Sequence, residues 1–136
     1  MTAVTTSDAI AVADFRAALR MFLRRTERVA RRSGLTPQRY LLLLMVKGAP
    51  NGSEQSTVTE LAERLQLAQS TVTELVSRAE DTGLIVRAQS ESDARVAYLR
   101  LTAEGERRLE LAFTALAIER ANLREAIAGL DPGAIG

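Results

Sequence analysis

Helical periodicity runs along most of this chain and gives way to alternation of apolar and polar residues in one region only, residues 84–101. Apolar residues three and four positions apart line one face of a helix, whereas strict alternation is typical of a half-buried strand. The longest helical patterns are at residues 8–33 and 103–129. The pattern therefore predicts a mainly α fold with a small β-hairpin.

The first long segment, residues 8–33, has an apolar seam and is followed by Gly34. The seam residues are Val12, Phe15, Leu19, Phe22 and Val29. Their spacing is that of one face of a helix, and a glycine is a common helix stop.

The last segment, residues 103–129, has a leucine every seven residues, at Leu109, Leu116, Leu123 and Leu130. A helix of this length spans about 40 Å at ~1.5 Å per residue. Two such helices do not fit over the core of so short a chain, and each leaves an apolar stripe that a second molecule can cover. A homodimer is predicted, because two-fold dimers are the commonest closed assemblies. The alternative is that both stripes pack on each other within one chain.

Between these segments, three shorter helices and two strands are predicted. Thr36 and Pro37 have the residue types of a helix start, and the apolar run at residues 40–46 indicates a core helix that stops at Gly48. Residues 49–56 have loop composition. A capping box at residues 57–60 begins a short helix that runs to residue 65, and a second helix covers residues 69–81. Two short helices with a tight connection form a helix-turn-helix.

Strands are expected at residues 84–88 and 95–101, with a polar turn at residues 89–94. A helix-turn-helix followed directly by a hairpin is a winged helix. The expected organisation is an N-terminal dimerisation helix (1–34), a winged helix-turn-helix (35–101) and a C-terminal dimerisation helix (102–136), together one structural domain.

Composition disfavours an enzyme. The chain has neither histidine nor cysteine, so the commonest general base and the thiolate metal ligands are absent. No nucleophile–base pair, metal-spaced cluster or glycine-rich phosphate loop is found, and no cofactor is expected. The longest apolar run is seven residues, and the first fifteen residues contain no Lys or Arg. These features predict a cytoplasmic protein without a membrane span.

Charge is spread unevenly along the chain. Residues 16–39 contain eight arginines and one acid, whereas residues 53–82 contain two arginines and six acids. The arginine-rich helix suits phosphate contacts. A role at a membrane surface is an alternative for this amphipathic segment.

Residues 35–105 resemble the MarR family of winged-helix transcription regulators. The resemblance rests on Leu-Thr-Pro-Gln at 35–38, Glu-Leu-Ala-Glu-Arg-Leu at 60–65, Ser-Thr-Val-Thr at 70–73 and Gly-Leu-Ile-Val-Arg at 83–87. Its most specific part is Asp-Ala-Arg at 93–95, followed by Leu-Thr-Ala-Glu-Gly at 101–105. The resemblance implies a DNA-binding transcriptional regulator, a ligand-responsive repressor that acts as a homodimer on a palindromic operator.

The resemblance also implies which residues meet double-stranded DNA. The helix at 69–81 is expected in the major groove and Arg95 of the hairpin in the adjacent minor groove, with Asp93 orienting the guanidinium of Arg95. A separate hypothesis, drawn from the residues and not from the resemblance, is that Arg39, Arg31 and Arg32 contact phosphate at the start of the second helix and compensate for the acidic residues near the recognition helix. The candidate site residues are Gln69, Ser70, Thr71, Thr73, Ser77, Arg78, Asp93, Arg95 and Arg39.

Two residues depart from the family pattern. Ala68 stands at the cap position before the recognition helix, where the family usually has a hydroxyl. Glu74 stands where a basic residue is common; it repels phosphate unless it accepts from cytosine or pairs with Arg78 at i+4. The alternative function is a winged-helix protein-interaction module with weak or lost DNA binding.

The family is similar in binding small aromatic or phenolic anions between its dimerisation helices and winged domain. Arg16, Arg20 and Tyr40 are candidates by position. The other interpretation of these residues is a solvated helix face and a core tyrosine. A thiol-oxidation switch is excluded by the absence of cysteine.

Overall fold

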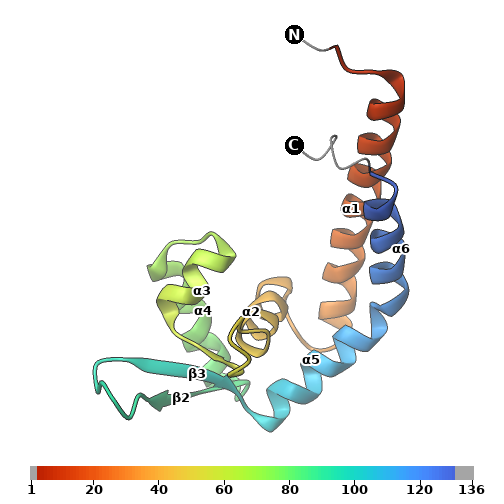
Figure 1. Cartoon of the computed structure of the whole chain (residues 1–136). Helices are drawn as coiled ribbons and strands as arrows, with labels where there is room; N and C mark the ends of the chain where they lie inside the picture. Colours follow the sequence, from red (N-terminus) through yellow and green to blue (C-terminus); the bar gives the residue numbers. More distant parts are fainter. Residues whose placement is uncertain (1–2, 131–136) are drawn as a thin grey trace.

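A computed structural model of the protein describes residues 3–130 and confirms the mainly helical fold with a small sheet (Figure 1). In chain order the elements are α1 (Thr6–Arg32), α2 (Pro37–Lys47), β1 (Gln55–Ser56), α3 (Val58–Leu65), α4 (Gln69–Asp81), β2 (Ile85–Gln89), β3 (Ala97–Leu101), α5 (Ala103–Ala115) and α6 (Ala117–Ala128). Helices α2, α3 and α4 lie beside the sheet, and α1 and α6 form a separate arm that α5 joins to it.

The helix starts follow the capping residues that the sequence indicates. Thr36 Oγ1 accepts from the backbone N–H of Arg39 at 3.1 Å, and Pro37 occupies the first turn. Thr57 and Glu60 form the complete capping box of α3. Helix α1 begins two residues earlier than predicted, because Thr5 accepts from the N–H of Asp8 and acts as its N-cap.

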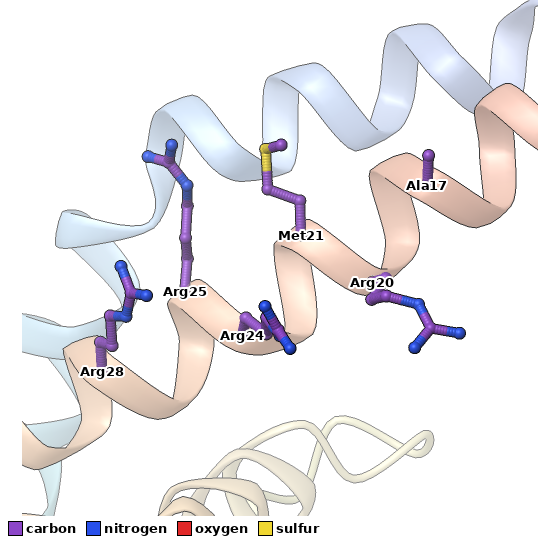
Figure 2. Close-up of a pocket in the computed structure, with 6 residues that line it drawn as sticks. All are labelled: Ala17, Arg20, Met21, Arg24, Arg25 and Arg28. Atoms are coloured by element: carbon purple, nitrogen blue, oxygen red, sulfur yellow. The ribbon is translucent and has the colours of Figure 1, made fainter.

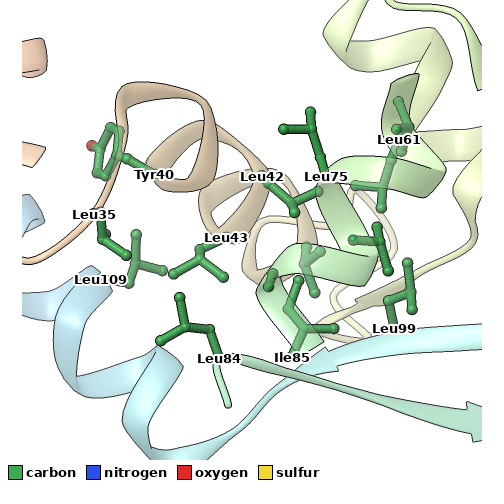
Figure 3. Packing of buried hydrophobic residues seen from close by; sticks show 14 of the residues in the cluster. Leu35, Tyr40, Leu42, Leu43, Leu61, Leu75, Leu84, Ile85, Leu99 and Leu109 are labelled. Carbon is green, nitrogen blue, oxygen red and sulfur yellow. The ribbon is translucent and has the colours of Figure 1, made fainter. Parts of the chain in front are cut away.

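Helix α2 is the centre of the core, as predicted. Leu42, Leu43 and Val46 have no solvent exposure and pack with side chains of α3, α4, the sheet and α5 (Figure 3). Replacing a leucine buried in this way by Ala costs roughly 2–5 kcal/mol. One residue of the apolar run differs from the expectation, since Leu41 is 39% exposed.

The wing is a three-stranded antiparallel sheet in the order β1-β3-β2, with Ile85 opposite Leu101 and Gln55 opposite Arg100. The prediction that residues 49–56 are entirely loop was wrong for the last two of them, Gln55 and Ser56, which form β1. Residues of β1 pair with β3, which lies more than forty positions along the chain, and two residues are too few to show alternation.

The motif at residues 101–105 joins the sheet to α5. Thr102 Oγ1 accepts from the N–H of Gly105 at 3.0 Å and donates to the carbonyl oxygen of Gly83 at 2.5 Å. Its N–H also donates to the carbonyl oxygen of Leu84 at 3.0 Å. A Cβ at Gly105 would overlap the Leu84 carbonyl, so the close approach of α5 to the strand requires glycine here.

The prediction of one continuous C-terminal helix was wrong, because the helix breaks at Leu116. Two donors converge on the carbonyl oxygen of Phe113: the N–H of Leu116 at 3.2 Å and Arg120 Nη1 at 2.6 Å. The guanidinium of Arg120 lies 3.6 Å from the centroid of the Phe113 ring. A side chain that enters the i→i−4 ladder is a known cause of a kink. The break lets α5 pack on α2 while α6 runs along α1.

The terminal helices cover part of their apolar stripes within one chain. Leu109 and Leu116 are buried, and Phe15, Phe22 and Leu123 are half-buried. Other large apolar side chains of these helices are exposed: Ile10, Val12, Met21, Leu23, Leu111, Phe113, Ile118 and Ile127. The end of the expected C-terminal dimerisation segment, residues 131–136, lies outside the described residues.

Candidate nucleic-acid interface

Helix α4 has a buried face and an exposed face, and the predicted site residues of this helix lie on the exposed face. Val72, Leu75, Val76 and Ala79 are buried. The predicted contact residues of α4 are all exposed: Gln69, Ser70, Thr71, Thr73, Ser77 and Arg78. Because the buried positions recur at helical spacing, the helix presents hydroxyl, amide and guanidinium groups to the outside.

The start of α4 lacks a side-chain cap at Ala68, as the sequence predicts. The amide Nε2 of Gln69 donates instead to Thr59 Oγ1 at 3.3 Å and so connects α4 to α3. The first backbone N–H groups of a helix have no partners within the helix, and they attract anions together with the helix dipole. The amino end of α4 therefore suits a phosphate.

Glu74 pairs with Arg78 on the exposed face of α4. Arg78 Nη2 donates to Glu74 Oε1 at 2.6 Å, and both side chains are more than half exposed. This is the i+4 pair that the sequence allowed. An exposed pair of this kind contributes only about 0.3–0.5 kcal/mol, so phosphate can compete with Glu74 for Arg78.

The tip of the wing holds Arg95 in a defined position. Asp93 Oδ1 accepts from the backbone N–H of Arg95 at 3.0 Å and from its Nε at 3.2 Å. The Ser90 hydroxyl accepts from the N–H groups of Ser92 and Asp93. The bonds from Arg95, the backbone bond first, hold the pKa of Asp93 below its ordinary value. The Arg95 side chain is 90% exposed, so the turn presents an oriented cation.

The structure does not join Arg39 to this face. Arg39 lies in the first turn of α2, and within residues 3–130 its side chain forms no hydrogen bond or ion pair. Arg16 and Arg20 are exposed on α1. Tyr40 is 4% exposed, which fits the core interpretation of this residue. Burial raises the pKa of Tyr40, and the positive charge of Arg120 opposes that rise.

One cation beside α4 was missed by the sequence analysis. Arg87 of β2 donates from Nε to Glu80 Oε1 of α4 at 3.0 Å and remains partly exposed. The pair joins α4 to the wing. A contact across a helix–strand corner has no spacing rule, so the sequence contains no signal for it.

Within residues 3–130, no group of three or more acidic residues could hold a metal ion. None of the helices in this range is both long and apolar enough to cross a bilayer.

Comparisons with known proteins agree with the motifs. Residues 33–96 match the family model of the MarR family. The HTH-type transcriptional repressor MdtR of Bacillus subtilis is 37% identical over 79 residues, which are 58% of this chain and 48% of the repressor. The match thus spans about half the length of that relative.

Solved structures show the same fold. The MarR family transcription regulator SP03579 has a TM-score of 0.70 at 24% identity, over 86% of this chain and 75% of its own. The M. tuberculosis transcriptional regulator MOSR, crystallised in complex with DNA, has a TM-score of 0.61 at 27% identity, over 81% of this chain and 77% of its own. The predicted resemblance and the winged-helix fold class are confirmed. All three relatives are named as regulators or repressors, in agreement with the prediction that this chain is not an enzyme.

Proposed function

We propose that this MarR-family chain is a transcriptional regulator that binds a palindromic operator in double-stranded DNA as a homodimer, and that it acts as a repressor. The observation that carries the proposal is the two-sided character of α4. All the predicted contact side chains of this helix are exposed, and the opposite face is buried in the core. The names of MdtR, a repressor, and of MOSR, crystallised with DNA, support it. The proposed location is the cytoplasm, because a regulator must have access to the DNA that it binds.

Helix and wing are proposed to enter adjacent grooves. A major groove about 12 Å wide admits one α-helix, and the first turns of α4 carry groups that bond base edges or phosphates. Arg95 is proposed to enter the minor groove, where a narrow A·T-rich stretch attracts guanidinium groups. Its fixed position beside Asp93 lowers the entropy lost on binding.

The exposed apolar surface of α1 and α6 supports the homodimer. The N-terminal half of α1 has an apolar depression of about 510 Å³, lined by Val4, Asp8, Ala9, Val12 and Ala13. Ile118 and Ile127 of α6 are 73% and 47% exposed. Apolar side chains gathered on two helices mark an interaction surface, and a second copy of the chain supplies the same surface in return.

The effector is proposed to be a small aromatic or phenolic anion that binds between the terminal helices and the winged domain. Figure 3 shows the Tyr40 hydroxyl pointing away from the buried leucine cluster. The charge of Arg120 on α6 reaches that hydroxyl. A ligand that bridges α2 and α6 can change how the arm sits on the winged domain. It shifts the equilibrium only by its difference in affinity between the two arrangements.

The decisive experiment is selection of random duplexes on the purified protein, followed by sequencing. We expect an inverted repeat with half-site centres about 10–10.5 bp apart. Sedimentation of the protein and of an Ile118→Asp variant tests the dimer in parallel. An unchanged distribution of bound and input sequences overturns the function, and a wild-type protein that stays monomeric at micromolar concentration overturns the dimer.

A second candidate is a protein-interaction module with weak DNA binding. It is favoured by the Glu74–Arg78 pair on the α4 face and by the acidic excess of residues 53–82. Retention on a random-sequence duplex separates the two functions, because phosphate contacts make retention fall steeply with salt.

A further inference from the structure

The C-terminal half of α1 has two adjoining depressions of about 440 and 400 Å³, and both are lined by Arg25 and Arg28. Figure 2 shows the residues that line the first of them. The first lies along α1, and the second reaches Ala115 and Glu119 at the α5–α6 junction. Together they bring five guanidinium groups to one surface: Arg20, Arg24, Arg25, Arg28 and Arg32.

Only one of these five cations has a counter-charge within residues 3–130. Arg25 Nη1 lies 3.1 Å from Glu119 Oε1. The side chains of the other four form no hydrogen bond or ion pair in the described part of the chain. Glu27, the acid of this half of α1, lines a further depression together with Arg20 and Arg24, and it forms no ion pair within residues 3–130.

In the Arg25–Glu119 ion pair, one of the two carboxylate oxygens has no hydrogen-bond donor. The Glu119 side chain is 14% exposed, and its Oε2 atom is buried without a hydrogen-bond donor. Arg28 lines the same depression but does not bond this free oxygen. The Glu119 carboxylate therefore holds Arg25 at the side of the depression, and the other four guanidinium groups have no ion-pair partner within residues 3–130.

We propose that these depressions form a binding site for a small molecule that carries a di- or triphosphate group. Guanidinium forks match phosphate oxygens in pairs, and four exposed cations without an ion pair favour a multiply charged anion. The volumes lie in the range of small-ligand sites. Ala17, Met21 and Val29 add apolar surface for the rest of the ligand.

The site is distinct from the DNA face of α4 and the wing, and it shares only Arg20 with the effector candidates named from the sequence. It lies on α1, which packs against α2, α5 and α6, while α4 and the wing lie beyond α2 (Figure 1). The surface is hollowed, which favours a compact ligand over duplex DNA. It also lies on the part of α1 that follows the apolar depression proposed for the dimer.

Titration calorimetry of the purified protein with sodium tripolyphosphate and with ATP, in 150 mM salt and without DNA, tests the site. We expect saturable binding of one anion per chain. An Arg24→Gln/Arg28→Gln double variant should raise Kd at least about tenfold, equal to ~1.4 kcal/mol. An Arg100→Gln/Arg124→Gln double variant removes the same charge from exposed positions of β3 and α6 outside the depressions and should change Kd less than about twofold.

The two probes distinguish the sources of the phosphate. Tighter binding of ATP assigns the site to a nucleotide, and equal binding assigns it to the phosphate chain alone. Equal losses in both double variants, no saturation, or displacement of the anion by random-sequence duplex DNA would overturn the proposal. The calorimetry uses no operator DNA. A negative result therefore rejects the anion site without rejecting the proposed regulator function, which the duplex selection tests separately. Far-UV circular dichroism verifies that each variant is folded.

Discussion

Arg108 of α5 donates from Nη1 to the carbonyl oxygen of Gly34 at 2.8 Å, a bond between residues 74 positions apart. Its Nε donates to Glu104 Oε1, also at 2.8 Å. One guanidinium thus fixes the turn between α1 and α2 against the first turns of α5. This contact joins the arm of terminal helices to the winged domain.

Gly34→Ala should destabilise the protein more than Gly52→Ala. Both glycines have φ +77°, a conformation that costs an alanine roughly 1–2 kcal/mol. A Cβ at Gly34 would also lie 2.9 Å from Arg108 Nη1, whereas nothing lies within 4 Å of one at Gly52. Urea unfolding of the two variants measures the difference, and equal losses would show that the Arg108 contact carries no cost.

Glu104→Gln should flatten the acid side of the stability profile. Hydrogen bonds from Arg107 and then Arg108 lower the pKa of Glu104 to about 2 in the folded protein. A lowered carboxyl pKa contributes stability above the unfolded value of ~4.3, and this contribution is lost as pH falls toward the folded value. The difference in Tm between wild type and Glu104→Gln should therefore be constant above pH 5 and shrink between pH 4.5 and 2. Glu110→Gln, an exposed change on the same helix, is the control for the loss of one negative charge.

Glu74→Gln should strengthen DNA binding. Removal of the charge frees Arg78 for phosphate and ends repulsion at the α4 face. We expect affinity to rise about twofold to fivefold, the equivalent of ~0.5–1 kcal/mol. The slope of log K against log salt should steepen by about 0.9. Fluorescence anisotropy with the selected duplex at several salt concentrations measures both quantities. An unchanged slope would mean that Arg78 does not reach phosphate.

Arg95→Ala should weaken binding by about tenfold to a hundredfold and reduce preference for A·T pairs beside each half-site. Asp93→Asn should have a smaller effect, because it keeps an oxygen for the Arg95 N–H and loses only the charge that orients the guanidinium. Repeating the duplex selection with both variants tests the assignment. Arg124→Ala, a change on α6, is the control. If Arg95→Ala lowers the affinity no more than Arg124→Ala does, the wing does not read the minor groove.

Most of the fold could be predicted because its signals are local. Thr36, Pro37 and the pair Thr57 and Glu60 cap the helices where the sequence placed them. The exposed face of α4 followed from the helical spacing of Val72, Val76 and Ala79. The Asp93–Arg95 pair could be anticipated because the two residues are only two positions apart.

What the sequence did not reveal depends on contacts between distant segments. The break at Leu116 lies in an unbroken heptad of leucines and needs Arg120 to bond a carbonyl oxygen. Strand β1 exists only because β3 lies beside it. Arg87 meets Glu80 around a turn whose geometry the residue types do not specify. The DNA contacts themselves, Arg39 among them, stay predictions.

The break at Leu116 makes α6 a lever whose pivot sits where the two halves of the molecule meet. Its twelve residues extend about 18 Å from that pivot at ~1.5 Å per residue, so a swing of about 10° moves the far tip by about 3 Å. In the proposed two-fold dimer the second copy has the same pivot, so a swing of both α6 helices changes the separation of their far tips.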